Sequence, residues 1–294
     1  MQKEISYAFF GTGALAESVL ATLVRNGYTP SLIVTKPDSP QGRHMLMTAP
    51  HIKTWADMKG IPTFQPASLR DISSNSPLHA EKFDLFIVAS YGKIIPEEIL
   101  NLPKHGILNV HPSLLPLYRG PSPIESVLLD GNITTGVSIM RLDKEMDHGP
   151  ILVQSAFIIP AEATSGTLEV SCGQLGGDML VQILPSYVEG NLIPKEQEHS
   201  KATVCKKIEK SMGEIKTTDK ADDIRRKFRA LTPWPGLYFF TKHDDKQIRV
   251  KVTGVDLVTD FESTATAKDV ITSVIPEGKK EMNWESFLRG YEKN

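Results

Sequence analysis

The sequence lacks most of the features that mark membrane and secreted proteins. It has only two cysteines, Cys172 and Cys205, in 294 residues, which excludes a disulfide framework and a cysteine-based zinc site. It has no run of about 18 uncharged apolar residues, so no transmembrane helix is expected. The N-terminal segment lacks the long apolar stretch and the small-residue cleavage site of a signal peptide. We therefore expect a cytoplasmic protein with no membrane partner.

A net positive charge is also missing. The formal net charge is −2, which argues against a general nucleic-acid binder. The charge is unevenly distributed, however, because residues 201–229 hold ten Lys and Arg against five Asp and Glu. Such a segment is either a solvated face or a local anion-binding surface on an otherwise acidic protein.

The first half of the chain alternates strand-like and helix-like segments. Strands are expected at residues 6–10, 31–35, 83–89, 107–110 and 136–141, and helices at 14–26, 52–59 and 165–189. Residues 151–159 are expected to add an antiparallel strand. This alternation predicts a doubly wound parallel sheet with helices on both faces.

The second half of the chain has a different pattern. Residues 191–200 are polar and contain Pro194, as in a linker, and residues 220–230 are expected to form an amphipathic helix. Short strand-like segments follow at 237–241, 247–258 and 269–275. Short strands separated by turns predict a small β-barrel. The length of the chain favours about two domains.

The most informative motif follows the apolar residues 106–108. Side chains alternate across a strand, so Asn109 and His111 point to the same side. Pro112 cannot donate to a sheet and should end the strand. The strand end is where open α/β folds hold their ligands. An amide that donates hydrogen bonds, beside an imidazole that moves protons, suits oxyanion stabilisation in acyl-type transfer.

A second candidate site lies in residues 135–150, where a strand runs into an acidic loop that ends near Gly149. Loops that follow strands often carry binding and catalytic groups. Asp147 is the candidate carboxylate for orienting a histidine, although an aspartate in a loop commonly serves only the turn. Asp143, Asp147 and His148 could in principle bind a metal, but no further ligand pattern supports this, and no metal is expected.

The segment from Gly11 to Ala16 matches the G-x-G-x-x-A pattern of dinucleotide-binding folds. That fingerprint also requires an acidic residue at the end of the second strand. Here the strand is followed by Lys36 and Pro37. The glycines therefore indicate a tight turn between a strand and a helix, and a dinucleotide-dependent oxidoreductase is disfavoured.

Residues 109–120 contain the order Asn-x-His-Pro-Ser-Leu-Leu-Pro, followed closely by Tyr-Arg-Gly. They resemble the signature of 10-formyltetrahydrofolate-dependent formyltransferases. Residues 91–96, 135–140, 146–149 and 164–168 resemble other parts of that family's first domain. Residues 233–236 and 278–282 resemble the second domain of its members that act on tRNA. The resemblance implies a Rossmann-like catalytic domain over residues 1–190, a linker over 191–204 and an OB-like tRNA-binding β-barrel domain over 205–294.

The resemblance also implies an activity and a site. The implied reaction transfers a formyl group from 10-formyltetrahydrofolate to the α-amino group of methionyl-initiator tRNA, by a monomer. The family's catalytic residues fall on Asn109, His111 and Asp147. In that role the amide and the imidazole stabilise a tetrahedral oxyanion, while the carboxylate orients the histidine, favours its imidazolium and relays the amine proton. The folate contacts fall on Tyr91, Gly92, Ser113, Leu114, Leu115 and Pro116, and the tRNA contacts are expected at Arg43, Lys206 and Lys207.

Other interpretations of the sequence remain open. A formyltransferase acting on a nucleotide amino sugar, or a 10-formyltetrahydrofolate hydrolase, would share the fold and the three catalytic residues. The loop with Arg43 and the basic segment 201–229 favour tRNA, because a nucleotide-sugar enzyme needs neither. A non-catalytic RNA-binding protein built on an OB barrel is disfavoured, because all three polar site residues are present.

Overall fold

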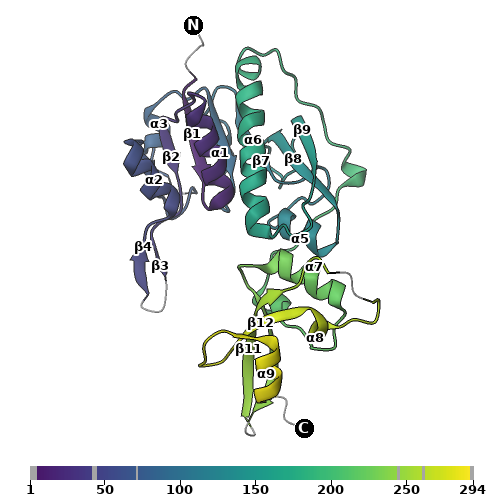
Figure 1. Cartoon of the computed structure of the whole chain (residues 1–294). Coiled ribbons are helices and arrows are strands. Elements are labelled where there is room, and N and C mark those ends of the chain that lie inside the picture. The colour runs from purple at the N-terminus through teal and green to yellow at the C-terminus, as the bar shows by residue number, and fades with distance from the viewer. Residues whose placement is uncertain (1–4, 42–44, 71, 244–245, 260–261, 292–294) are drawn as a thin grey trace. The chain divides into compact units, whose positions relative to one another are not determined.

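The computed structural model describes residues 5–41, 45–70, 72–243, 246–259 and 262–291 (Figure 1). The contacts between residues divide the chain into two compact units. The first comprises Met1–Pro121, Thr135–Phe157 and Glu169–Cys205, and the second comprises Ser122–Thr134, Ile158–Leu168 and Lys206–Asn294. Within the described ranges, no helix has the length and apolar character needed to cross a membrane.

A seven-stranded sheet forms the centre of the first unit, in the order β5-β2-β1-β6-β7-β8-β9 (Figure 1). Its strands are β1 (Tyr7–Gly11), β2 (Leu32–Val34), β5 (Thr63–Phe64), β6 (Leu85–Ala89), β7 (Ile107–His111), β8 (Thr134–Arg141) and β9 (Ile151–Ile158). The first five strands in this order, β5, β2, β1, β6 and β7, pair in parallel, and β8 pairs with β7 antiparallel. The predicted mainly parallel α/β sheet is confirmed.

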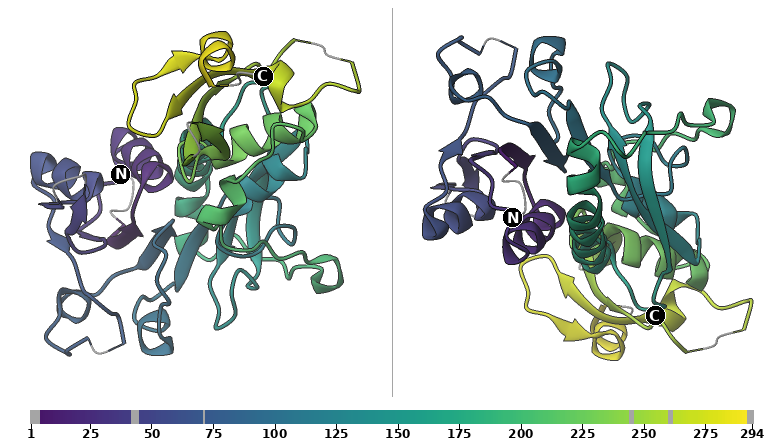
Figure 2. Two further views of the ribbon diagram at one scale, coloured as in Figure 1. Left: turned by 90° about the horizontal axis from the view of Figure 1, so that it is seen from below. Right: turned by 90° about the horizontal axis from the view of Figure 1, so that it is seen from above.

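One face of this sheet is covered by α1 (Ala14–Arg25) and α6 (Ser165–Val188), which lie side by side (Figures 1 and 2). Three glycines allow α6 to lie close to α1 and to β7. A Cβ at Gly173 would lie 2.6 Å from the carbonyl oxygen of Leu15 in α1, and one at Gly176 would lie 2.4 Å from Val110 in β7. Gly177 faces Thr22 of α1 in the same way. The small residues therefore let α6 reach both the helix and the sheet.

The other face of the sheet packs against α3 (Pro77–Ala80) and α4 (Glu97–Leu100), while α2 (His51–Lys59) precedes β5. Phe10 of β1 and Phe86 of β6 lie in this core with ring centroids 5.1 Å apart. Leu78 from α3 and Ile99 from α4 complete the same cluster. Because helices cover both faces, β1 and β6 have no charged or strongly polar residue, which is why the sequence identified them well.

The strand order reverses between β1 and β6, and open α/β folds bind their ligands at such a switch point. The G-x-G-x-x-A segment lies at the end of β1. A Cβ at Gly11 would lie 2.6 Å from the Ala16 side chain, and Gly13 has φ 88° at the start of α1. Both glycines therefore have a packing or backbone reason, which supports the interpretation as a tight turn.

A short hairpin after β2 was not expected from the sequence. It consists of β3 (Ser39–Gln41) and β4 (Leu46–Thr48), which pair antiparallel. Leu46 and Met47 on β4 are exposed. Arg43, the expected tRNA contact, lies between these strands and outside the described residues.

The second unit contains a four-stranded antiparallel sheet in the order β10-β11-β12-β13. Its elements are α5 (Pro123–Leu129), α7 (Ala221–Leu231), β10 (Leu237–His243), β11 (Lys246–Val255), α8 (Ala267–Val270), β12 (Ile271–Pro276), β13 (Met282–Asn283) and α9 (Trp284–Tyr291). Phe239 of β10 packs edge-on against Trp284 and Phe287 of α9. The β structure expected at the C-terminal end of the chain, as a small OB-like barrel, is present as this antiparallel sheet.

The two units do not follow the expected domain boundaries. Helix α5 packs against α7, the Ser165 hydroxyl donates to the Thr232 carbonyl at 2.7 Å, and the Arg229 Nε donates to the Ala163 carbonyl at 2.9 Å. These contacts group Ser122–Thr134 and Ile158–Leu168, both expected in the catalytic domain, with the second unit. Residues 191–204, expected as a linker, belong to the first unit. The domain boundaries inferred from the sequence stay a prediction.

Candidate active site

Strand β7 places Asn109 and His111 on one side of the sheet. Asn109 is paired with Val88 of β6 and with Met140 of β8, so the strand is held from both edges. Both side chains are buried, with exposed fractions of 9% and 4%. Among the described residues, none forms a hydrogen bond with the Asn109 side-chain amide. Its N–H groups are therefore available to a bound substrate.

The chain turns sharply after β7, and side-chain hydrogen bonds hold the turn. The Ser113 hydroxyl donates to the Leu117 carbonyl, and the Ser138 hydroxyl donates to the Ser113 carbonyl, each at 2.6 Å. The Leu115 N–H donates to Ser138 Oγ at 3.0 Å. Ser113 and Leu115 are therefore buried within the turn, while Leu114 and Pro116, also expected at the folate, are half-buried.

The two ring nitrogens of His111 face different groups. Its Nε2 lies 2.9 Å from the carbonyl oxygen of Tyr118. Because a carbonyl can only accept, this nitrogen carries the proton. Its Nδ1 faces Asp147 Oδ1 at 3.6 Å. The expected contact between the strand-end histidine and Asp147 is present in the structure.

Asp147 is held in an uncommon backbone conformation with φ 51°. The left-handed region costs most L-residues about 1–2 kcal/mol, less for aspartate. The Gly120 N–H donates to Asp147 Oδ2 at 2.7 Å. Gly120 has φ 112°, and a Cβ there would lie 2.7 Å from the Cys205 carbonyl oxygen. Only glycine fits at this position, and its N–H orients the carboxylate.

Two residues that the sequence did not single out complete this arrangement. Gln197 donates through Nε2 to the carbonyls of Asp147 at 2.9 Å and Gly149 at 2.7 Å. Its Oε1 accepts from Arg119 Nε at 3.2 Å and Nη2 at 2.6 Å. Arg119 lies within the signature run, which was the available signal. No local pattern connects it with a glutamine so far along the chain.

The three residues considered for a metal do not come together. The His148 Nδ1 lies 2.7 Å from Asp143 Oδ2, and the His148 ring stacks on His199 with centroids 4.0 Å apart. Asp147 faces His111 instead. Across the described part of the chain, no group of three His, Cys, Asp or Glu side chains is arranged to hold a metal ion.

Tyr91 and Gly92 follow β6 at the switch point of the sheet. Tyr91 is buried, packs edge-on against Phe10, and its hydroxyl has no hydrogen-bond partner among the described residues. Burial raises the pKa of Tyr91 to about 12. The half-buried apolar side chains of Ile95 and Leu142 pack against the same cluster. An orphaned hydroxyl among apolar groups fits a flat heteroaromatic ligand with polar edges, as folate has.

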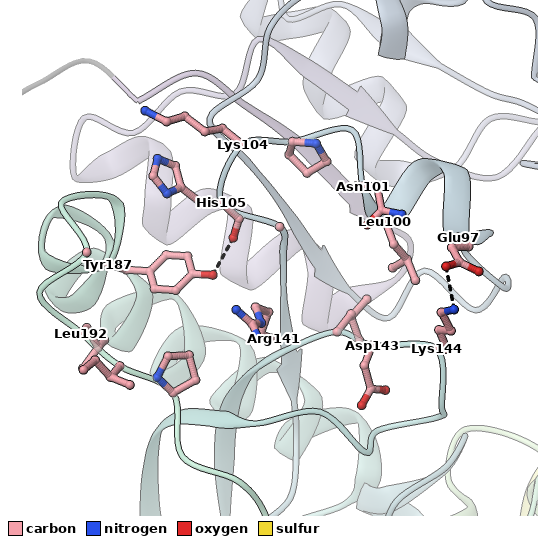
Figure 3. Close-up of a pocket in the computed structure, with 16 residues that line it drawn as sticks. Glu97, Leu100, Asn101, Lys104, His105, Arg141, Asp143, Lys144, Tyr187 and Leu192 are labelled. Carbon is pink, nitrogen blue, oxygen red and sulfur yellow. Dashed lines mark hydrogen bonds and ion pairs between the residues drawn. The ribbon is translucent and has the colours of Figure 1, made fainter.

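A cavity of about 690 Å³ lies at the beginning of β7 (Figure 3). His105 and Gly106 line it on one side, and Arg141, at the end of β8, lines it on the other. The cavity includes Asp143 and Lys144, the first part of the loop that carries Asp147. The catalytic candidates are not among its lining residues, because Asn109 and His111 lie toward the other end of β7.

Of the residues expected to contact tRNA, Arg43 falls outside the described residues. Lys206 and Lys207 belong to the second unit, where both side chains are exposed. Their exposure leaves them open to solvent and to anions.

The chain is similar to known proteins in both sequence and fold. A family model described as formyl transferase matches residues 4–184, and one described as formyl transferase, C-terminal domain, matches residues 207–292. The methionyl-tRNA formyltransferase of Chloroflexus aggregans is 44% identical over 79% of this chain and 75% of its own length. That of Geobacillus sp. is 35% identical over 97% and 94%. The crystal structure of an N-formyltransferase from Helicobacter canadensis, in complex with folinic acid and dTDP-3-aminofucose, has a TM-score of 0.59 and 16% identity, covering 95% of this chain and 98% of that one.

Proposed function

The chain belongs to the formyl transferase family and is a formyltransferase enzyme, and from this premise we propose that it formylates the α-amino group of methionyl-initiator tRNA with 10-formyltetrahydrofolate. The observation that carries the proposal is the contact between His111 and Asp147 beside the open amide of Asn109 at the end of β7. The choice of acceptor rests on relatives whose names specify methionyl-tRNA, one of them matching 97% of the chain.

The proposed reaction begins with attack by the neutral α-amine on the formyl carbon. An α-amine has a pKa near roughly 8, so the neutral form is accessible at physiological pH. A bond forms between the amine nitrogen and the formyl carbon, and a tetrahedral oxyanion results. Asn109 supplies an amide N–H to this oxygen. The bond from the formyl carbon to the folate nitrogen then breaks, and the amine proton ends on that nitrogen.

His111 and Asp147 have complementary roles in the proposal. Asp147 holds the imidazole by its Nδ1 edge and relays the amine proton toward the leaving nitrogen. The Nε2 proton of His111 is held by the Tyr118 carbonyl at 2.9 Å. Donation from this ring to the oxyanion therefore requires the Tyr118 hydrogen bond to be shared or exchanged when the substrate arrives.

The folate side of the proposal draws on the residues after β6 and β7. Tyr91 offers a hydroxyl that has no hydrogen-bond partner among the described residues, and Gly92, Leu114 and Pro116 are further candidates. The Helicobacter canadensis enzyme, which has the same fold, binds folinic acid. Ser113 and Leu115 are assigned an indirect role, because the turn that they stabilise presents their neighbours.

The tRNA side draws on Lys206 and Lys207, which are exposed in the second unit, and on Arg43. Lysines that contact phosphates release counterions on binding, so tRNA affinity should depend on salt. Because aminoacylated tRNA is a cytoplasmic substrate, the proposal also implies a cytoplasmic enzyme. We propose a monomer that needs no metal.

The first test is formyl transfer from 10-formyltetrahydrofolate to methionylated initiator tRNA. Uncharged tRNA and UDP-4-amino-arabinose serve as comparison acceptors. We expect formylmethionyl-tRNA from the charged tRNA and no product from the other two acceptors. Turnover of the sugar alone, or hydrolysis of the folate without transfer, would assign the same site to another acceptor and overturn the proposal.

A further inference from the structure

Three consecutive residues in the loop after β7 form hydrogen bonds with His111, Asp147 and Gln197. The Tyr118 carbonyl accepts from His111, Arg119 donates to Gln197, and the Gly120 N–H donates to Asp147. This short segment therefore orients the His111 ring, the Asp147 carboxylate and the Gln197 side chain. Gln197 in turn contacts the backbone of Asp147.

Gln197 spans two carbonyls of the loop that carries Asp147. Its Nε2 donates to the Asp147 carbonyl at 2.9 Å and to the Gly149 carbonyl at 2.7 Å. Asp147 has φ 51°, a conformation that persists only when the surroundings impose it. The two hydrogen bonds fix the backbone on both sides of His148, and so they fix the direction in which the Asp147 carboxylate leaves the chain.

The orientation of the Gln197 amide is determined by its partners. The amide oxygen accepts from Arg119 Nε and Nη2, and both amide hydrogens point at carbonyl oxygens. A flipped amide would set its oxygen against two carbonyls and its NH₂ against a guanidinium, which can only donate. Gln197 is 6% exposed and Arg119 is 9% exposed, so water cannot easily replace these bonds.

The backbone of Arg119 also forms hydrogen bonds, and these fix its position. Its N–H donates to the Thr203 carbonyl at 2.9 Å, and its carbonyl accepts from the Cys205 N–H at 2.7 Å. The segment from Gln197 to Cys205 is thereby attached to the loop after β7 by both side-chain and backbone bonds.

From these contacts we infer that Gln197 is a positioning residue, which acts through Asp147 and depends on Arg119 for its own orientation. The inference rests on the proposed function, since it requires Asp147 to act in transfer. Loss of the Gln197 amide lets the Asp147 loop relax, which moves the carboxylate away from His111. Binding of the acceptor should change little, because Gln197 is buried.

The main experiment is a double-mutant cycle on formyl transfer, with Gln197→Ala, Asp147→Asn and the double variant. We expect Gln197→Ala to lower kcat about tenfold or more, with KM for the tRNA within about twofold. In the Asp147→Asn background the same substitution should have almost no further effect on kcat, because the group through which it acts is already gone. An equal loss in both backgrounds would mean a merely structural role and would overturn the inference.

A second variant separates positioning from folding. Gln197→Glu keeps the side-chain length and can pair with Arg119, but it replaces the two donors with an oxygen that faces two carbonyls. At pH 8, where an ordinary carboxylate is ionised, we expect kcat to fall as in Gln197→Ala, while circular dichroism at the assay temperature shows that the variant is folded. Unchanged kcat in Gln197→Glu would contradict the inference.

The matched control is Glu196→Ala, which alters the exposed neighbour on the same segment and should leave kcat and Tm unchanged. The cycle also separates the catalytic role of Asp147 from the positioning role of Gln197. Full activity in Asp147→Asn would overturn the proposed catalytic role. Lost activity in Asp147→Asn together with full activity in Gln197→Ala would overturn only the positioning role of Gln197.

Discussion

At the scale of single residues, the site combines one open group with several fixed ones. The His111 ring and the Asp147 carboxylate each have partners that determine their orientation. The Asn109 amide is hydrogen-bonded to none of the described residues, although Asn109 is only 9% exposed. An amide that keeps slight solvent exposure and makes no internal hydrogen bond is free to pair with a ligand at the strand end.

This contrast gives a prediction for Asn109→Ala. The amide is proposed to donate only to the oxyanion, so its removal should lower kcat by about 10²–10³-fold, as loss of one oxyanion donor typically does. Because the amide has no partner to lose in the described structure, the Tm should change little. Transfer kinetics and thermal unfolding on the same preparation check both parts.

Asn191→Ala is the control for this substitution, since Asn191 is exposed at the end of α6. It should leave both kcat and Tm unchanged. A large fall in the Tm of Asn109→Ala, accompanied by a small change in kcat, would show that the amide supports the fold and not the reaction.

At the scale of secondary-structure elements, the sequence predicted the long apolar strands and the amphipathic helices closely. Strand β6 was expected at residues 83–89 and lies at Leu85–Ala89, because a strand buried on both faces is a continuous apolar run. The β3–β4 hairpin and α9 were missed. The hairpin is short and contains Pro40, and α9 is rich in aromatic residues, which suit strands equally well.

The site was predictable only where its chemistry is local in the sequence. Asn109 and His111 share a strand, so alternation alone placed them side by side. The contact between His111 and Asp147 came from a resemblance to a family. The Gln197 contacts join residues 78 and 50 positions apart, and no periodicity or turn pattern encodes a pairing of that kind.

The packing of α6 against α1 can be tested with Gly173→Ala. Alanine is the better helix former by about 0.8–1 kcal/mol, but its Cβ would lie 2.6 Å from a backbone oxygen of α1. Backbone cannot move aside as a side chain can. We therefore expect a net loss of about 1–3 kcal/mol in the free energy of unfolding, the usual cost of overpacking, measured by urea denaturation.

Gly290→Ala in α9 is the matched control. A Cβ at Gly290 meets nothing within 4 Å, and its φ lies outside the left-handed region. The same substitution should there stabilise the protein by about 0.4–1 kcal/mol, because only the helix propensity changes. If both variants stabilised the protein equally, close packing of α6 would not be the reason for Gly173.

The turn after β11 gives a prediction about pH. Asp256 Oδ1 accepts from the N–H groups of Val258 and Thr259 at 3.0 Å each. The Thr259 side chain and these N–H groups hold the pKa of Asp256 at about 2, with a smaller contribution from Arg225. A carboxyl whose pKa is lower in the folded state stabilises it above the unfolded pKa near 4, and this stabilisation is lost as the pH falls toward 2.

Asp256→Asn should therefore lower the Tm at pH 7, and the difference from the unmodified protein should shrink steadily between pH 4 and pH 2. Asp222→Asn is the control, because Asp222 pairs with the same Arg225 at 3.9 Å but is largely exposed. It should show a small difference at every pH. A difference for Asp256→Asn that stayed constant down to pH 2 would exclude the charge as its source.

At the scale of the whole molecule, an acidic protein is proposed to bind a polyanion. The net charge of −2 opposes tRNA at long range, so binding has to depend on local basic groups. Residues 201–229 carry the excess of positive charge, and Lys206 and Lys207 are exposed at its beginning. Their exposure means that little desolvation opposes a phosphate contact.

The double variant Lys206→Ala/Lys207→Ala tests this directly. For double-stranded nucleic acid, each lost phosphate contact reduces the slope of log K against log salt by roughly 0.9. We expect the slope for methionyl-initiator tRNA to decrease by up to about 2, with weaker binding at low salt and unchanged KM for the folate. Lys59→Ala/Lys82→Ala removes the same charge from exposed positions of the first unit and should leave the slope unchanged. An equal decrease in both double variants would mean that tRNA responds to the net charge of the protein and not to contacts at Lys206 and Lys207.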